Sequence, residues 1–201
     1  MLVIAFAGLG EVGGREIWGA NYFRKCGFSF VSFVPQQAHW YPDAALAISH
    51  EIDDFIADFD HRVTYGYSMG GHAALKTAKL FEARRVVAMC PQYSIDPSVI
   101  KDERYNAFWT AECGTHLRAL EPSGARRLVF SDRDCGLDQR HLDKFRQVEI
   151  VEQLNCTGAG HEIWNALDSR GMIGVDGPIT YALRGEITPK SFAKHYEATT
   201  R

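Results

Sequence analysis

Short runs rich in β-branched and aromatic residues alternate along the chain with longer segments of helical periodicity. The six runs are Leu2–Ala7, Phe28–Val34, Arg62–Tyr67, Arg85–Met89, Arg127–Ser131 and Val148–Leu154. The segments with apolar residues at helical spacing are Glu16–Lys25, Ala44–Phe59, Gly70–Phe81 and Gln139–Phe145. This alternation predicts an α/β protein of three layers, in which helices cover both faces of a mostly parallel sheet of about six strands.

The length of the chain favours one folding unit. A chain of 201 residues can bury one core well but is short for two, so we expect a single domain over residues 1–201. Residues 91–124 form a stretch rich in aromatic side chains, longer than one crossover needs. We expect these residues to form a small inserted cap, whereas the polar tail after Gly177 has no clear assignment.

Composition excludes several classes of function. The net charge is −3 and the basic residues are scattered, which argues against a nucleic-acid partner. The five cysteines include no C-x-x-C pair, so we expect neither a metal site nor a redox centre, and reduced thiols fit a cytoplasmic protein. The N-terminal segment lacks a basic leader and no apolar run is long enough to span a bilayer, so we expect no membrane association.

The motif that carries chemistry is Gly66-Tyr67-Ser68-Met69-Gly70, between a predicted strand and an alanine-rich helix. A G-x-S-x-G pattern in this context is typical of a strained strand-to-helix turn that exposes a nucleophilic serine. The small residues at Gly66 and Gly70 let neighbouring backbone approach without a Cβ clash. The alternative interpretation is an ordinary β–α turn in which Ser68 caps the helix.

With this motif and its strand–helix context, the sequence resembles the α/β-hydrolase superfamily over nearly its whole length. The resemblance implies a triad in the chain order serine, acid, histidine. It also implies a base in the loop after the last strand, where Gly158-Ala159-Gly160-His161 stands. We therefore expect His161 to accept the proton of Ser68, the alternative being an exposed loop histidine.

The resemblance places the acid just beyond the fifth predicted strand, where three aspartates occur. In the superfamily the acid usually lies three positions after a small residue that ends the strand, which maps onto Ser131 and Asp134. We therefore predict Asp134 as the acid, with Asp132 as the alternative if the strand ends earlier. Asp138 is interpreted as the cap of a helix that begins at Gln139.

The resemblance also implies an oxyanion hole, made by the Met69 N–H after the nucleophile and the Leu9 N–H in the loop after the first strand. That loop contains Gly8-x-Gly10-x-x-Gly13, which could instead suggest dinucleotide binding. However, Val34-Pro35-Gln36 supplies no acidic residue at the end of the second strand. We therefore favour the hydrolase interpretation and expect no organic cofactor.

Aromatic residues near the expected carboxyl ends of strands are candidates for the substrate pocket. Trp40, Trp109 and Trp164 occupy such positions and favour an apolar or ring-bearing substrate group, although tryptophans at these spacings are more often core. The superfamily usually has two further strands before the one that leads into the oxyanion loop. Their lack here predicts a trimmed sheet, whose exposed edge a tail or a second copy of the chain could cover in a homodimer.

These residues predict a serine hydrolase that cleaves a small acyl ester or thioester through an acyl-enzyme intermediate. Two alternatives stay open. The same triad could transfer the acyl group to an alcohol, or the chain could be a catalytically idle binding module with this fold.

Overall fold

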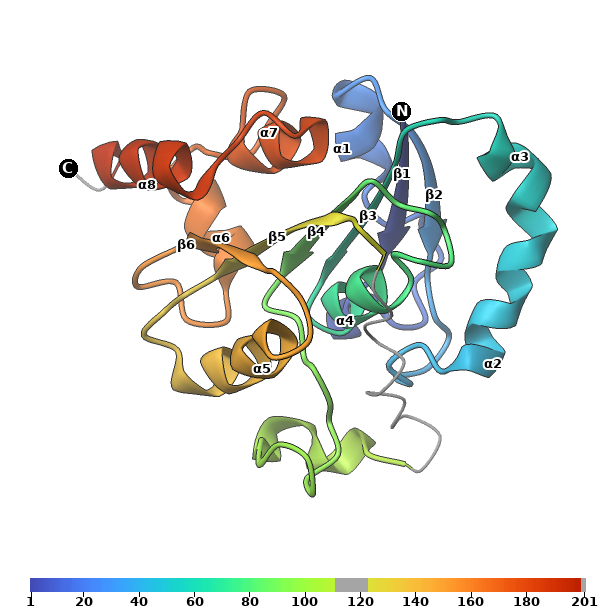
Figure 1. Ribbon diagram of the computed structural model, residues 1–201, viewed down its shortest axis with the longest axis horizontal. Helices are drawn as coiled ribbons and strands as arrows, with labels where there is room; N and C mark the ends of the chain where they lie inside the picture. Colours follow the sequence, from blue (N-terminus) through green and yellow to red (C-terminus); the bar gives the residue numbers. More distant parts are fainter. Residues whose placement is uncertain (111–122, 200–201) are drawn as a thin grey trace.

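A computed structural model describes residues 1–110 and 123–199 of the chain (Figure 1). Its six strands form one sheet in the order β2-β1-β3-β4-β5-β6, and every neighbouring pair is parallel. The strands are β1 (Leu2–Phe6), β2 (Ser29–Phe33), β3 (Arg62–Tyr67), β4 (Arg85–Met89), β5 (Arg126–Ser131) and β6 (Glu152–Asn155). The predicted fold class, a parallel sheet with flanking helices, is confirmed.

Helices cover both faces of the sheet. They are α1 (Ala20–Lys25), α2 (Asp43–Leu46), α3 (Asp53–Ala57), α4 (Met69–Lys76), α5 (Gly136–Arg146), α6 (Ile163–Asp168), α7 (Pro178–Arg184) and α8 (Pro189–Ala198). Alternate strand residues point to opposite faces, as β1 illustrates. Leu2, Ile4 and Phe6 pack in one buried cluster with α2, α3, α4 and α5, and Val3 and Ala5 pack in another with α1, α6, α7 and α8.

Several predicted elements are longer than the observed ones, as two apolar segments show. The predicted helix over 44–59 is broken into α2, the 3₁₀ helix η2 (Ala47–Ile52) and α3. The predicted strand over 148–154 begins only at Glu152. Ile150 is 85% exposed, so this apolar residue lies outside the core and the pattern that included it overestimated the strand.

The tail that had no sequence assignment forms α7 and α8. Pro178 opens α7 after Gly177, and Thr188 caps α8 through a reciprocal pair of hydrogen bonds with Ser191. Phe192 of α8 is fully buried against the sheet. These helices therefore complete the core beside β4 and β6.

The segment between β4 and β5 leaves the sheet at its carboxyl end. Residues 91–110 contain the 3₁₀ helix η3 (Glu103–Phe108), drawn in light green below the sheet in Figure 1. The remainder of the predicted cap, residues 111–122, lies outside the described residues. The described part brings Gln92, Arg104 and Tyr105 to the carboxyl edge of the sheet.

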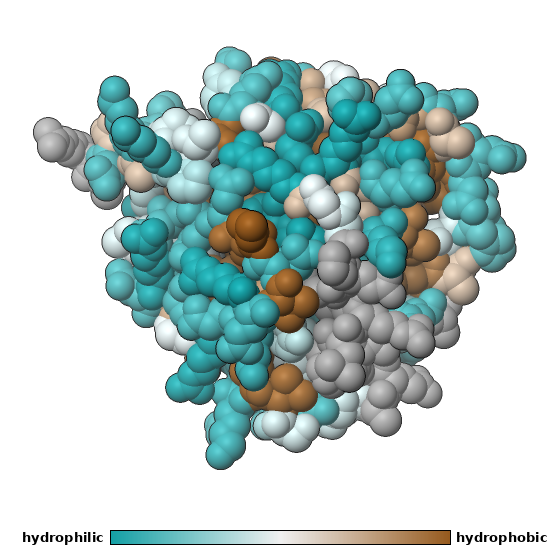
Figure 2. All heavy atoms as spheres, in the orientation of Figure 1, coloured by the Kyte–Doolittle hydropathy of each residue, from teal (hydrophilic) through white to brown (hydrophobic). Residues whose placement is uncertain are grey.

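Among the described residues, no helix has both the length and the apolar character required to cross a bilayer. On the face shown in Figure 2, hydrophilic residues predominate and apolar side chains are gathered in small separate groups. The edge strand β2 is partly exposed, and the homodimer stays a prediction.

Candidate active site

Ser68 lies in a strained turn between β3 and α4. Its φ of 53° is in the left-handed region, which costs energy for any residue that carries a Cβ. The two motif glycines make room for this turn, because a Cβ on Gly66 would collide with the Gly70 carbonyl and one on Gly70 with the Phe6 carbonyl. Ser68 makes no capping hydrogen bond to α4, so the interpretation as a simple helix cap does not hold.

The Ser68 hydroxyl contacts His161, which follows β6 as predicted. Its Oγ lies 3.1 Å from His161 Nε2. The loop before the histidine turns back over the sheet through positive φ values at Gly158 and Gly160. The imidazole is 22% exposed, so it can reach both the serine beneath it and a ligand from solvent.

The carboxylate that contacts His161 is Asp138, and this corrects the predicted choice of Asp134 and the alternative of Asp132. Asp138 Oδ2 lies 2.8 Å from His161 Nδ1. Helix α5 begins at Gly136 instead of Gln139, so Asp138 is in its first turn and is not its cap. The first turn of a helix favours a carboxylate, and the turn of the backbone directs this side chain inward to the imidazole.

The other two aspartates have different surroundings. Asp132 is buried and accepts hydrogen bonds from the Gly160 and Asp134 N–H groups at 2.9 and 3.0 Å. It therefore holds the loop that presents His161. Asp134 itself is exposed.

A buried ionic network surrounds Asp138. Arg104 Nη2 donates to Asp138 Oδ1 at 2.7 Å, and the same guanidinium makes a paired contact with Asp102. Burial alone would raise the pKa of Asp138, but hydrogen bonds and charge from His161 and Arg104 outweigh it and hold this pKa below its usual value. His141 Nε2 lies 3.2 Å from Asp102 Oδ2, which completes the network.

Replacement of Arg104 by methionine should destabilise the fold by about 3 kcal/mol at pH 7, because it leaves two buried carboxylates without their shared cation. Burial raises the pKa of Asp102, but hydrogen bonds from His141 and Arg104 reverse this and lower it. Carboxyl groups with a lowered pKa stabilise the fold above the unfolded pKa of about 3.9, and this contribution is lost as the pH falls through the folded pKa. The deficit of Arg104→Met in urea unfolding should therefore keep its full size from pH 7 down to about 4 and shrink as the pH is lowered further.

Arg140→Met is the matched control, since Arg140 is exposed and its guanidinium bonds only the Lys101 carbonyl among the described residues. We expect it to change the free energy of unfolding by less than about 0.5 kcal/mol. An Arg104→Met deficit that is the same at all pH values would show that packing of the side chain, and not its charge, stabilises this region.

Gln92 and Tyr105 cover Ser68, and sequence reasoning missed both. Gln92 Nε2 lies 3.2 Å from Ser68 Oγ and 3.1 Å from the Tyr105 hydroxyl, which is 3.4 Å from His161 Nε2. Trp40 is fully buried and donates from its indole N–H to Gln92 Oε1 at 3.2 Å. One signal for Gln92 was its place three residues after the end of β4, at the same edge of the sheet as Ser68.

The loop predicted to complete an oxyanion hole lies against the turn that carries Ser68. A Cβ on Gly8 would be 3.0 Å from the Tyr67 carbonyl oxygen. Leu9 begins the 3₁₀ helix η1 (Leu9–Glu11) and Met69 begins α4, so each N–H is in a first turn, where helical donors have no intrahelical acceptor. The glycine loop contains η1, and α1 begins only at Ala20, which departs from the strand–loop–helix of a dinucleotide site.

The two remaining predicted pocket residues are far apart along the chain and in different environments. Trp109 ends η3 and packs against the cluster that contains α4 and α5. Trp164 is in the first turn of α6, partly buried, and lines a cavity beside Glu162. Trp40, described above, is part of the wall around Ser68 instead of an open pocket surface.

Cys90, Asp138 and His161 offer ligand atoms within 4.8 Å of one another, so these three residues could approach a metal ion. Burial and the neighbouring Asp138 raise the pKa of the Cys90 thiol well above its usual value. A protonated thiol is a poor metal ligand. The chemistry of this donor set therefore fits a hydrogen-bonded imidazole and carboxylate better than a metal centre.

Comparison with known proteins gives no match to a family model and none to a curated protein sequence. Among solved structures, a capsule O-acetyltransferase of Neisseria meningitidis serogroup A is 11% identical with a TM-score of 0.61, covering 86% of each chain. The fluorophosphonate-binding serine hydrolase F of Staphylococcus aureus is 13% identical with a TM-score of 0.57, covering 90% of this chain and 83% of its own. An esterase of the archaeon Pyrobaculum calidifontis is 18% identical with a TM-score of 0.51, covering 93% and 77%.

These similarities extend over most of the described sheet and its helices. The chain has the α/β-hydrolase fold, as the resemblance in its sequence implied.

Proposed function

We propose that the protein is a serine hydrolase that cleaves a small acyl ester or thioester, with Ser68 as nucleophile, His161 as base and Asp138 as acid. The observation that carries this proposal is the continuous chain of contacts from Ser68 Oγ to His161 Nε2 at 3.1 Å and from His161 Nδ1 to Asp138 Oδ2 at 2.8 Å. This is the arrangement that lets an imidazole remove a serine proton while a carboxylate fixes its tautomer.

In the first half of the reaction, Ser68 Oγ attacks the acyl carbon and its proton passes to His161 Nε2. The negative charge on the carbonyl oxygen is stabilised by the N–H groups of Leu9 and Met69. The bond between the acyl carbon and the leaving oxygen or sulfur then breaks, and His161 returns the proton to the leaving group. A water molecule repeats these steps on the acyl-enzyme, releasing the carboxylic acid and restoring Ser68.

Two assays on the unmodified chain test this function. A fluorophosphonate probe should label the protein covalently at Ser68, and a series of nitrophenyl acyl esters of graded chain length should reveal turnover and the preferred acyl group. Protein that stays unlabelled and hydrolyses no ester of the series would instead fit the catalytically idle binding module.

Acyl transfer to an alcohol is the second candidate. It is favoured by the similarity to the capsule O-acetyltransferase, which has the highest TM-score of the three structures compared above. Ser68 is only 5% exposed because Gln92 and Tyr105 cover it. A cover of this kind keeps water away from an acyl-enzyme, so that an acceptor alcohol can react with it in preference to water. Product analysis with added alcohols distinguishes the two, because a transferase converts the ester to a new ester instead of the free acid.

A further inference from the structure

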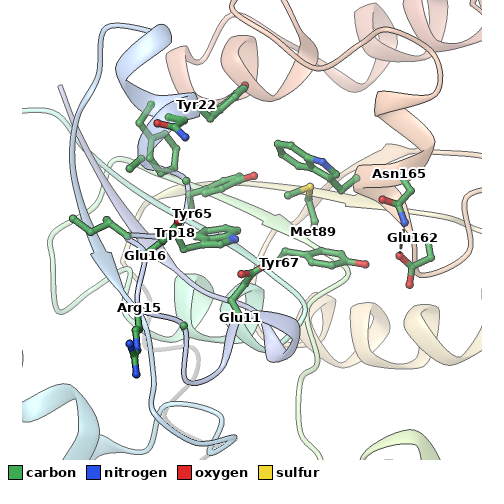
Figure 3. A pocket seen from close by; sticks show the side chains of 17 residues that line it. Glu11, Arg15, Glu16, Trp18, Tyr22, Tyr65, Tyr67, Met89, Glu162 and Asn165 are labelled. Carbon is green, nitrogen blue, oxygen red and sulfur yellow. Dashed lines mark hydrogen bonds between the residues drawn. The ribbon is translucent and has the colours of Figure 1, made fainter.

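A cavity of about 710 Å³ lies beside the candidate triad on the face of the sheet covered by α1 and α6 (Figure 3). Tyr65 and Tyr67, at the end of β3, form its floor. Tyr67 directly precedes Ser68, and its hydroxyl donates to the His161 carbonyl at 2.6 Å. Glu162, on the opposite side, directly follows His161. The cavity therefore lies beside both proposed catalytic residues.

The walls of this cavity are aromatic. Trp18 stacks on Tyr65 with ring centroids 5.4 Å apart and planes within 15° of each other. Tyr22 and Trp164, which also line the cavity, meet edge to face with ring centroids 6.0 Å apart. Trp18 and Trp164 are partly exposed, and rings of this kind pack against the C–H face of another ring. Aromatic side chains with polar tips are suited to ligands that are partly apolar and partly wet.

The polar side chains that line the cavity include carboxylates, amides, one guanidinium and the hydroxyl of Tyr65. Tyr65 is 2% exposed, and its hydroxyl has no hydrogen-bond partner within the described ranges. Figure 3 shows this hydroxyl pointing into the cavity, away from Trp18. A buried hydroxyl without a partner costs free energy, so a ligand that bonds to it gains the interaction that the free protein lacks.

The charged side chains that line the cavity limit the class of ligand that it can bind. Glu11, Glu16 and Glu162 line the cavity, and Arg15 is the one basic residue of its lining among the described residues. An excess of carboxylates disfavours phosphate or carboxylate ligands and favours a group that donates several hydrogen bonds. A long acyl chain binds better in a tunnel of aliphatic side chains than among these aromatic rings and carboxylates.

We propose that this cavity binds the ring of a neutral sugar, which is the alcohol part of the ester that the candidate triad cleaves or forms. This proposal rests on the proposed function for the identity of the reaction, but the binding itself needs no chemistry. The partly exposed ring of Trp18 receives the C–H face of the sugar, the Tyr65 hydroxyl bonds to it, and the carboxylates accept from its hydroxyl groups. The volume is larger than an ammonium group needs, which favours a sugar over a small cation.

The test is a binding measurement on the Ser68→Ala variant, which removes turnover. Methyl glycosides of glucose, galactose, mannose and N-acetylglucosamine are titrated by saturation-transfer NMR and calorimetry. We expect at least one to bind with a Kd on the order of 1 mM. Adding Trp18→Ala should weaken that binding by about tenfold or more, and adding Phe55→Ala, an exposed ring on α3, should leave it unchanged.

Tyr65→Phe keeps the ring and removes only the unpartnered hydroxyl. Because this hydroxyl has no partner to lose among the described residues, the variant should fold as well as the parent yet bind the glycoside about three- to tenfold more weakly. This separates recognition of the sugar from loss of structure, which Trp18→Ala alone cannot do.

Three outcomes would overturn the proposal. The first is that no glycoside binds, and the second is that the Trp18→Ala and Tyr65→Phe variants bind the glycoside as tightly as the parent. The third is that only tetramethylammonium or hexanoate binds and responds to these substitutions.

The proposed function and the proposed sugar site can fail separately. A chain that binds a glycoside but hydrolyses and transfers no acyl group would overturn the proposed function and leave the sugar site standing. A chain that turns over nitrophenyl esters but binds no glycoside would do the reverse.

Discussion

Ser68→Ala should reduce kcat for a nitrophenyl ester by roughly 10⁵- to 10⁶-fold, to the residual rate that binding and oxyanion donors alone provide. In the proposed mechanism the hydroxyl attacks the acyl carbon, and no other described side chain at the end of β3 would replace it. Alanine carries the same Cβ as serine, so it adopts the φ of 53° at no greater cost. The fold should survive, and near-native circular dichroism with lost ester hydrolysis is the expected result.

Cys90 supplies the matched control, because its thiol lies within 4.8 Å of ligand atoms of both His161 and Asp138. Its raised pKa keeps it protonated and unreactive at neutral pH. Cys90→Ala should therefore retain fluorophosphonate labelling and ester hydrolysis. Loss of hydrolysis in Cys90→Ala, together with retained hydrolysis in Ser68→Ala, would identify a thiol and not Ser68 as the nucleophile.

The strands and the nucleophile turn could be predicted from the sequence because both depend on local patterns. Arg62–Tyr67 and Arg85–Met89 have the predicted bounds, since their β-branched residues are buried on both faces of a parallel sheet. The turn at Ser68 follows from two glycines whose missing Cβ atoms allow close backbone contacts. The glycines before His161 likewise carried a local signal that placed this residue in the correct loop.

The residues around Asp138 depend on how distant segments pack, which a local pattern does not encode. Asp132 and Asp138 are both buried, and only the start of α5 at Gly136 decides which of them faces His161. Arg104 and Gln92 reach the site from the segment after β4, through contacts that span 34 and 24 residues of sequence. Their contacts with the site exist only because the folded sheet brings these segments to one edge.

The tail after Gly177 shows a different limit. Its helix signals were present in the sequence, as Gly177-Pro178 and Thr188-Pro189 are ordinary starts of α-helices. The sequence did not reveal which part of the sheet these helices pack against. Phe192 is buried because α8 packs beside β6, and such a contact between distant segments requires the completed sheet.

Asp138→Asn should lower kcat for a nitrophenyl ester by up to roughly 10⁴-fold. The carboxylate accepts from His161 Nδ1 and so leaves Nε2 free to receive the Ser68 proton. An amide that presents its NH₂ group to Nδ1 favours the opposite tautomer, in which Nε2 carries a hydrogen and cannot act as the base. The charge that stabilises the imidazolium and pairs with Arg104 is lost as well.

The neighbouring aspartates provide graded controls for this prediction. Asp134→Asn should leave kcat within about twofold, because Asp134 is exposed, and surface substitutions rarely disturb a site that they do not contact. Asp132→Asn should have an intermediate effect, since its carboxylate accepts from the Gly160 N–H and so holds the loop that carries His161. If Asp134→Asn lowered kcat as much as is expected for Asp138→Asn, Asp134 would be the functional acid, as the sequence predicts. The contact of Asp138 with His161 would then have to break during turnover.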